Sequence, residues 1–240
     1  MKYINKSKPP RLIEVWFRKQ PKGEDGYRLN CVYREMPKKD TVKAKLLKEQ
    51  GGLCCYTGIR IDKDSSHIEH FKPQTLCKKE SNYEDIDYNN LLAAYPDKDA
   101  PRCEFGAHNK DDWYDEELLI SPLHRQCETR FTFDEFGDIG AAQDDDTGAI
   151  QTIKNLRLDH SILQTLRLKA IEEVLYPDDQ ELSEAQLRRI VESNYSHKDK
   201  KGRYPEFCFV IEQVARKLLL KKEKNRKRRE AIQKQSNSNK

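Results

Sequence analysis

Three short segments of the sequence carry side chains of the types that hydrolyse phosphodiester bonds. They are Glu69–His70, Asn90 and His108–Asn109–Lys110. Such hydrolysis requires a base that activates water, a divalent cation at the scissile phosphate, and a group that keeps the base in its working tautomer. Successive residues on a strand face opposite sides, so we expect Glu69 and His70 to address the metal and the attacking water separately. These segments form the candidate site of a metal-dependent hydrolase.

The elements that must position these side chains are short. Residues 53 to 71 are expected to form a hairpin whose last strand ends before Pro73, because proline cannot continue a ladder. Residues 85 to 95 are expected to form a short helix that carries Asn90. An irregular, charged loop is expected from there to Trp113. Before the hairpin, residues 41 to 50 are predicted to be a helix that stops at a pair of glycines.

Two further regions flank this central part. Residues 1 to 40 are rich in Lys, Arg, Pro and Gly and hold a few apolar anchors, which predicts an N-terminal arm that packs on another surface. After an acidic link at residues 143 to 148, three helical patterns follow. The first ends at Pro177, the second opens with a capping box at Ser183, and the third starts near Pro205.

Composition limits the class of protein. Of the 240 residues, 36% are hydrophobic and 36% are charged, which favours folded modules with long solvated helices. There is no apolar run of about 18 residues, so no membrane span is expected. The first residues lack the apolar core of a signal peptide, and we therefore expect a cytoplasmic protein. In that reducing compartment the seven cysteines are expected to be thiols or metal ligands rather than disulfides.

Charge is concentrated near the end of the chain. The formal net charge is only +4, but nine cations stand against one anion between Arg216 and Arg229. Such a run is either a solvated helix end or a surface that contacts nucleic-acid phosphates or the acidic surface of a partner. On a nuclease, phosphate contact is the favoured interpretation.

The order of the motifs resembles a known family. The segment from Leu53 to Lys110 resembles the HNH, or ββα-metal, endonucleases, and more closely the PtuB nuclease subunits of Septu and retron-associated anti-phage systems. The matching stretches are Met1 to Lys6 with Pro9–Pro10, Gly51 to Tyr56, Ile68 to Pro73, Asn89 to Leu92, His108 to Trp113, and Ser121 to Leu123 with Cys127–Glu128 and Phe131.

The resemblance implies a role for each site residue. It makes His70 the general base and Glu69 a metal ligand. It gives Asn90 the task of orienting the base, His108 that of the last metal ligand, and Lys110 a phosphate contact. The implied cofactor is Mg²⁺ or another divalent cation, and the implied reaction is one-metal hydrolysis.

The resemblance also implies an α+β fold. We expect an N-terminal arm over residues 1 to 40 and a ββα-metal nuclease core over 41 to 140. A mostly α-helical region with a basic last helix is expected over 150 to 230, followed by a disordered tail over 231 to 240.

The cysteines depart from the pattern of many relatives. Those relatives have a Cys-x-x-Cys pair in the hairpin, where this chain has Thr57 at the second position. Cys103 is likewise not followed by a second cysteine at the required spacing. A structural Zn²⁺ site built from Cys54 or Cys55 with Cys103 and Cys127 stays open, but buried, apolar roles for these thiols are favoured.

Partners and substrate follow from the same resemblance. It implies an effector of an anti-phage complex that acts with an ABC/SMC-like ATPase of the PtuA type and, in some systems, with a retron reverse transcriptase and its RNA–DNA. The substrate is a nucleic acid, either DNA or an RNA such as tRNA. The helical region and the N-terminal arm are the expected docking surfaces.

Other interpretations remain open. The chain could be a non-catalytic nucleic-acid-binding module or a structural subunit of such a complex. His67-x-Glu69 faintly resembles the zinc deaminases, but Arg102 and the missing second cysteine break that signature. Asp62-x-Asp64 suggests a calcium loop, yet the required glycine and final glutamate are absent.

Overall fold

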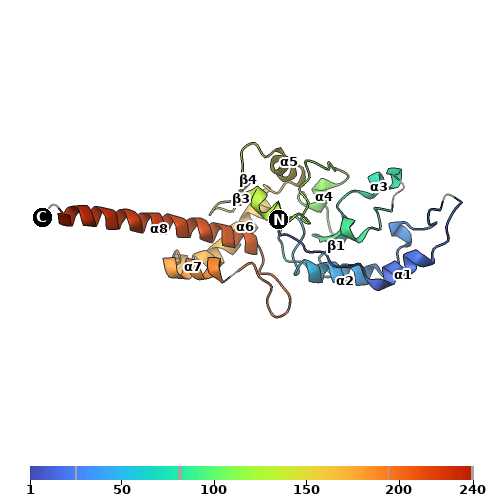
Figure 1. Cartoon of the computed structure of the whole chain (residues 1–240), viewed down its shortest axis with the longest axis horizontal. Helices are drawn as coiled ribbons and strands as arrows, with labels where there is room; N and C mark the ends of the chain where they lie inside the picture. Colours follow the sequence, from blue (N-terminus) through green and yellow to red (C-terminus); the bar gives the residue numbers. More distant parts are fainter. Residues whose placement is uncertain (25, 81–82, 194, 239–240) are drawn as a thin grey trace.

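The computed structural model describes residues 1–24, 26–80, 83–193 and 195–238. In this part of the chain, two small two-stranded antiparallel sheets lie among helices. The α+β class expected from the sequence is therefore confirmed, and it is compatible with an HNH nuclease. Figure 1 shows the sheets in the body of the molecule and one long helix running away from it.

The first sheet pairs β1 (His67–His70) with β2 (Leu91–Ala94). In its register Glu69 faces Leu92, and His70 faces Leu91. The prediction of a helix over residues 85 to 95 is wrong, because only the turn η2 (Tyr88–Asn90) is helical and the apolar run after it is a fully buried strand. A short apolar run buried on both faces has no periodicity that separates strand from helix.

The predicted hairpin over residues 53 to 71 is present only in part. Leu53 and Arg60 form one isolated bridge, and the partner of β1 comes from later in the chain. The helix predicted over residues 41 to 50 is confirmed: it is α2 (Lys39–Glu49), which packs on β2. Helix α3 (Gln74–Glu80) follows β1, and the four-residue helix α4 (Ala107–Lys110) lies within the loop that was expected to be irregular.

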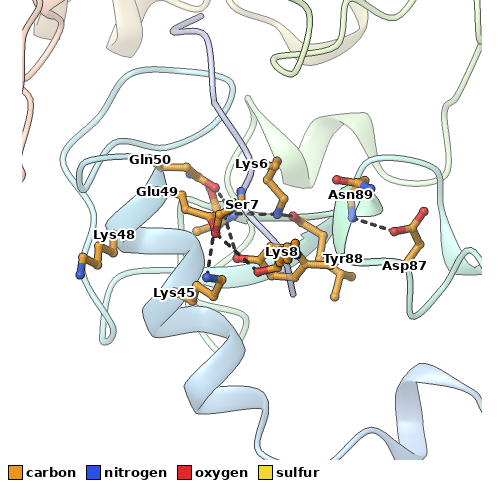
Figure 2. A network of polar contacts seen from close by, with 12 residues as sticks. Lys6, Ser7, Lys8, Lys45, Lys48, Glu49, Gln50, Asp87, Tyr88 and Asn89 are labelled. Atoms are coloured by element: carbon orange, nitrogen blue, oxygen red, sulfur yellow. Dashed lines mark hydrogen bonds and ion pairs between the residues drawn. The ribbon is translucent and has the colours of Figure 1, made fainter. Parts of the chain in front are cut away.

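Part of the N-terminal segment packs on the chain's own core. Met1 and Ile4 are buried, and helix α1 (Arg11–Lys19) and turn η1 (Tyr33–Glu35) follow. Lys6 donates to the carbonyl oxygen of Leu91 at 2.8 Å and lies over the ring of Tyr88. Figure 2 shows Glu49 of α2 gathering Lys6, Ser7 and Tyr88 around its carboxylate. The segment therefore clamps the turn that leads into β2.

The second half of the chain is mostly helical. Its elements are η3 (Arg125–Arg130), β3 (Phe131–Phe133), β4 (Ile139–Ala141), α5 (Thr147–Leu156), α6 (Ser161–Leu175), η4 (Pro177–Asp179), α7 (Glu184–Glu192) and α8 (Cys208–Ser238). The capping box predicted at Ser183 is confirmed, since its side chain and that of Gln186 satisfy each other's backbone N–H groups. Helix α5 was not predicted, and Asp146 of the expected acidic link is its N-cap.

The two halves share one continuous hydrophobic core. Gly58 adopts a φ of +83°, and a Cβ there would lie 2.7 Å from the ring of Phe209, so the turn and the start of α8 pack too closely for a side chain. The backbone N–H of Phe207 also donates to the carbonyl of Gly58. The start of α8 is thus packed directly on the turn at Gly58, which precedes β1 in the sequence.

Helix α8 changes character along its length. Its first turns are buried through residues such as Val210, Val214 and Leu218, while the described side chains after Glu223 are exposed. Residues 231 to 238, expected to be a disordered tail, continue this helix; they begin with good helix formers and contain no Gly or Pro to end it. The last two residues of that expected tail lie outside the described residues. No described helix is long and apolar enough to cross a membrane.

Candidate functional site

A polar cleft of about 400 Å³ opens where β1, α4 and the loop between β2 and α4 meet. Its lining residues are His67, Glu69, Lys98, Ala100, Arg102, Ala107, His108 and Asp111. Glu69 and His108 were predicted as site residues, and they meet here from elements about 40 residues apart. The cleft carries the half-buried carboxylate of Glu69 and two imidazoles, while Lys98, Arg102 and Asp111 are largely exposed and Arg102 pairs with Asp111.

Glu69 is held by one of its two carboxylate oxygens. Its Oε1 accepts from the Lys110 ammonium at 3.0 Å and from the Tyr56 hydroxyl at 3.2 Å. Its Oε2 lies 3.6 Å from Nε2 of His67. Burial alone would raise the pKa of Glu69, but His67 and Lys110 outweigh it and hold that pKa below its ordinary value. The carboxylate is therefore ionised, anchored, and turned toward the cleft.

Lys110 lies beneath the cleft rather than in it. Its side chain is 1% exposed, and besides Glu69 it donates to the carbonyl oxygen of His70 at 3.1 Å. The resemblance assigned Lys110 a phosphate contact. In the structure its ammonium group is occupied by these internal acceptors, so it fixes the position of Glu69 and of the end of β1.

His67 belongs to this cleft, although sequence reasoning gave it no role in a nuclease site. Its Nδ1 hydrogen-bonds the carbonyl oxygen of Pro96, and its ring stacks on that of His108 with centroids 5.7 Å apart. Burial lowers the pKa of His67, but the hydrogen bonds to Glu69 and Pro96 and the charge of Glu69 raise it above its ordinary value overall. The signal that would have found His67 is strand alternation, since it precedes Glu69 by two residues and shares its face.

His108 reaches the cleft from α4. Its Nδ1 accepts from the backbone N–H of Cys103 at 3.0 Å. Burial, followed by the nearby His67 and Arg102, lowers the pKa of His108 below its ordinary value. The imidazole is therefore neutral at physiological pH, and its proton resides on Nε2 because Nδ1 is the acceptor.

His70 points away from this cleft. Its Nε2 lies 2.9 Å from the carbonyl oxygen of Asp85, its Nδ1 lies 3.3 Å from the side-chain amide of Gln74, and the ring of Tyr33 meets it edge-on at 4.4 Å. The residue is 6% exposed, and burial lowers the pKa of its imidazole. The structure thus brings Glu69, His108 and Lys110 together but places the ring of His70 on the opposite side of β1.

Asn90 fixes the chain just after β1. Its side chain accepts from the N–H of Lys72 at 2.7 Å and donates to the carbonyl oxygens of Lys72 and Glu84, each at 3.0 Å. Within the described residues, its hydrogen bonds do not reach His70. Asn90 was expected to orient His70. In the structure its side chain instead hydrogen-bonds the backbone of Lys72, two residues further along the chain.

The cysteines proposed for a zinc site do not gather at one point. Cys54 accepts from the backbone N–H of Tyr95 at 3.3 Å; burial would raise the pKa of its thiol, but hydrogen bonds from Cys55, Thr57 and that N–H lower it to about 6. Cys127 lies elsewhere, within 3.9 Å of the carbonyl oxygen of Pro122, and burial raises its pKa to about 11. Among the described residues, no group of three or more His, Cys, Asp or Glu is close enough to hold a metal ion.

The donor set of the cleft nevertheless fits a divalent cation that keeps water or substrate ligands. Glu69 Oε2 and His67 Nε2 lie 3.6 Å apart, and their side chains are 12% and 14% exposed. Ions such as Mg²⁺ use only one or two protein ligands when phosphate oxygens and water complete the shell. The chemistry therefore matches a cation bound together with its substrate rather than a closed structural site.

Comparison with known proteins gives a distant similarity. No protein-family model matches the chain. It is 29% identical to a protein of Vibrio cholerae serotype O1 biovar El Tor named "Retron Vc95 putative HNH endonuclease". The matched 142 residues amount to 58% of this chain and 67% of that protein. This similarity supports an HNH endonuclease family and, at that coarse level, a nuclease-type hydrolase.

Proposed function

We propose that this protein is a metal-dependent HNH endonuclease that hydrolyses phosphodiester bonds, with β1, β2 and α4 as its ββα-metal core. The observation that carries the proposal is Glu69, whose one oxygen is fixed by Lys110 and Tyr56 while the other faces a cleft lined by two histidines. A shielded carboxylate that is kept ionised and aimed into a cleft attracts a cation there. The similarity to an HNH endonuclease supports the same conclusion.

The protein's own groups would act on the phosphate from several sides. Glu69 would hold a divalent cation, which would supply stabilisation of the negative charge on the reacting phosphate. His108 presents an Nε2–H to a phosphate oxygen. Lys98 and Arg102, which also line the cleft, contact the phosphates of the nucleic acid and do not read its base sequence. His70 is proposed from its sequence position as the base. For that role the amide of Gln74 must leave its Nδ1, which it now occupies at 3.3 Å. The ring, which does not line the cleft, must also turn from the opposite side of β1 toward the phosphate.

Helix α8 is proposed to hold nucleic acid along the extension that leaves the body of the molecule (Figure 1). Lys221, Lys224 and Arg228 occupy one side of the helix at the spacing of residues that neighbour each other on a helical surface. Among the described residues these three form no ion pair. By contrast, Lys222 pairs with Glu181, just before α7, and Arg226 pairs with Glu184 at the start of α7. Such a row of cations matches the phosphates of DNA or of an RNA such as tRNA.

The biological setting proposed is an anti-phage complex. The relative in Vibrio cholerae is named for a retron, which supports a defence role and a nucleic-acid substrate. We further propose an ABC/SMC-like ATPase partner of the PtuA type and a retron reverse transcriptase with its RNA–DNA. Nucleotide sensing would belong to the partner, because the sequence holds no GxxxxGK[ST] motif.

The test is cleavage of supercoiled plasmid and of total tRNA by the purified chain, alone and with its ATPase partner. The reaction is run with Mg²⁺, with Mn²⁺ and with EDTA, beside Glu69→Gln, His70→Ala and Glu173→Gln, an exposed control on α6. We expect cleavage only with metal, loss in Glu69→Gln and His70→Ala, and near-normal rates in the control. Cleavage that persists in EDTA or in Glu69→Gln contradicts the proposal.

A second function is favoured by one specific observation, the enclosure of His70 by Gln74, Asp85 and Tyr33. A permanently enclosed base is compatible with a non-catalytic subunit that only binds nucleic acid. In that case the chain binds DNA or tRNA in a salt-dependent manner, and no metal or partner combination produces cleavage.

A further inference from the structure

Two histidines flank Glu69 in the cleft, and their hydrogen bonds give them opposite chemical characters. The partner of His67 Nδ1 is the carbonyl oxygen of Pro96, which can only accept. The Nδ1 of His67 therefore carries the proton, and in the neutral ring Nε2 carries a lone pair. A histidine whose second nitrogen is bound to a backbone carbonyl is the usual arrangement of a metal-ligating imidazole.

His108 has the reverse arrangement. The partner of its Nδ1 is the backbone N–H of Cys103, which can only donate. The proton of the neutral ring is therefore on Nε2, so this nitrogen donates hydrogen bonds and has no lone pair for a metal. Of the two histidines that line the cleft, His67 is the one whose Nε2, in the neutral ring, offers a lone pair toward Glu69.

The space between His67 and Glu69 matches an ion. The Nε2 lone pair and the ionised Oε2 face each other at 3.6 Å, and two acceptors in this position repel unless a positive charge, either a proton or a cation, lies between them. Bonds of about 2.1 Å from nitrogen and oxygen to one ion, meeting at roughly the tetrahedral angle, span nearly this separation. The other oxygen of Glu69 is taken by Lys110 and Tyr56, so the carboxylate would bind through Oε2 alone.

We propose that His67 and Glu69 together hold the divalent cation of this site, while His108 donates its Nε2–H to a phosphate oxygen of the substrate. This rests on the proposed nuclease function and deepens it, because it replaces the ligand pair Glu69 and His108 with a pair on a single strand face. An imidazole and a carboxylate favour Mn²⁺, Co²⁺, Ni²⁺ or Zn²⁺ more than an all-oxygen site does. The site is therefore expected to bind Mn²⁺ more tightly than Mg²⁺.

The experiment is Mn²⁺ binding to the full chain, followed by calorimetry and by pulsed electron paramagnetic resonance, which detects a nitrogen atom bound to the ion. Variants are His67→Ala, His67→Gln and His108→Ala, with the exposed His197→Ala as the matched control. Gln at position 67 keeps a polar side chain of similar length but has no ring nitrogen, so it separates ligand loss from local unfolding. Thermal unfolding of each variant shows which ones are folded.

We expect nitrogen coupling in the wild type, in His108→Ala and in His197→Ala, and its loss in both His67 variants. The Mn²⁺ affinity of the His67 variants should fall at least about tenfold. Coupling that survives in folded His67→Gln, or that disappears in His108→Ala, overturns the inference, as does a wild type that binds no Mn²⁺.

Cleavage measured on the same samples separates the two failures. If the wild type cuts nucleic acid in a metal-dependent way but its nitrogen coupling does not depend on His67, the ligand assignment fails and the nuclease function stands. If the wild type neither cuts nor binds Mn²⁺, both fail together.

Discussion

Lys110 shows how a single buried side chain sets the geometry of the cleft. Its side chain is 1% exposed, and its ammonium group binds both the carboxylate of Glu69 and the carbonyl oxygen of His70. Because Glu69 and His70 are adjacent on β1, the ammonium group of Lys110 holds both the carboxylate of Glu69 and the backbone of the strand in place. Without it, Glu69 would be ionised and shielded from water with no ammonium beside it.

Lys110→Met is therefore expected to lower the free energy of unfolding by ~3–5 kcal/mol, the usual cost of breaking a buried pair from one side. Urea unfolding measures this change. The double variant Glu69→Gln with Lys110→Met should recover part of the loss, since no charge is left unpaired. Lys169→Met, an exposed change on α6, is the control and should stay within about 0.5 kcal/mol of the wild type. A Lys110→Met protein as stable as the control would show that the pair does not hold the strand.

Among single residues, sequence reasoning predicted some of the residues that meet at the cleft and missed others. The predicted site held Glu69, His70, Asn90, His108 and Lys110. The structure brings Glu69, His108 and Lys110 together, but His70 and Asn90 do not line the cleft. Sequence reasoning missed His67 because the adjacent pair Glu69–His70 fits the family pattern without it. The groups around His70 come from segments far apart in sequence, so no local pattern could indicate that Tyr33 and the carbonyl of residue 85 meet there.

Among the secondary-structure elements, Asn90 ties β2 to the chain that leaves β1. Its amide makes bonds to both backbone groups of Lys72 and to the carbonyl of Glu84. Asn90→Ala should cost ~1–3 kcal/mol, because these backbone groups lose their partners. Hydrogen exchange should also become faster at residues 71 to 77. Asn89→Ala, an exposed neighbour, is the matched control, and equal exchange in both variants would contradict this role.

Helix α5 depends on Asp146, which caps its N-terminus and pairs with Arg130. Asp146→Ala should cost ~1–2 kcal/mol at neutral pH, the usual value of a cap. The side-chain hydrogen bond from Arg130 holds the pKa of Asp146 below its ordinary value of 3.8. A depressed carboxyl pKa gives stability that is present above that ordinary value and is lost as pH falls through the folded pKa.

The stability difference between wild type and Asp146→Ala should therefore be constant near neutral pH and shrink in the acid range below 3.8. Urea unfolding at a series of pH values tests this. Asp146→Asn keeps the cap and loses the charge, so it should be less destabilised than Asp146→Ala, and its own difference from Asp146→Ala should hardly depend on pH. A wild-type advantage that grows on acidification would contradict the assignment.

Element predictions succeeded where a local chemical signal exists and failed where only packing decides. The capping box at Ser183 predicted the start of α7 correctly, because its bonds are made within one turn. The run Leu91–Ala94 was predicted as helix and is a strand. Its conformation is decided by packing against β1 and α2, and these tertiary contacts leave no local pattern in the sequence. Helix α4 has four residues, too few for any periodic pattern to indicate it.

Across the whole molecule, α8 joins the shared core to a long charged extension. Its buried first part packs against β3, α6 and α7, and its exposed part leaves the body, as Figure 1 shows. The basic run was predicted from the sequence, and a disordered tail was predicted after it from residue 231. In the structure the helix continues to Ser238. A helical row of cations presents phosphate contacts at fixed spacing.

Lys224→Glu with Arg228→Glu should weaken binding to DNA and tRNA uniformly across sequences. The slope of log affinity against log salt should become shallower by about 2, because two cations no longer neutralise phosphates. Fluorescence anisotropy titrations at several salt concentrations measure the slope. Lys169→Glu, an exposed change on α6, is the control. An unchanged slope in the double variant would remove α8 from the nucleic-acid surface.

Metal-dependent cleavage of nucleic acid by the whole protein depends, in this proposal, on the single carboxylate of Glu69. The decisive measurement is the rate of plasmid and tRNA cleavage as Mn²⁺ is titrated against wild type, Glu69→Gln and Glu173→Gln, with the proposed ATPase partner present. We expect a metal-dependent rate in the wild type and the Glu173 control, and a rate at background in Glu69→Gln at every metal concentration. Equal rates in the wild type and in folded Glu69→Gln would show that this carboxylate does not take part in cleavage.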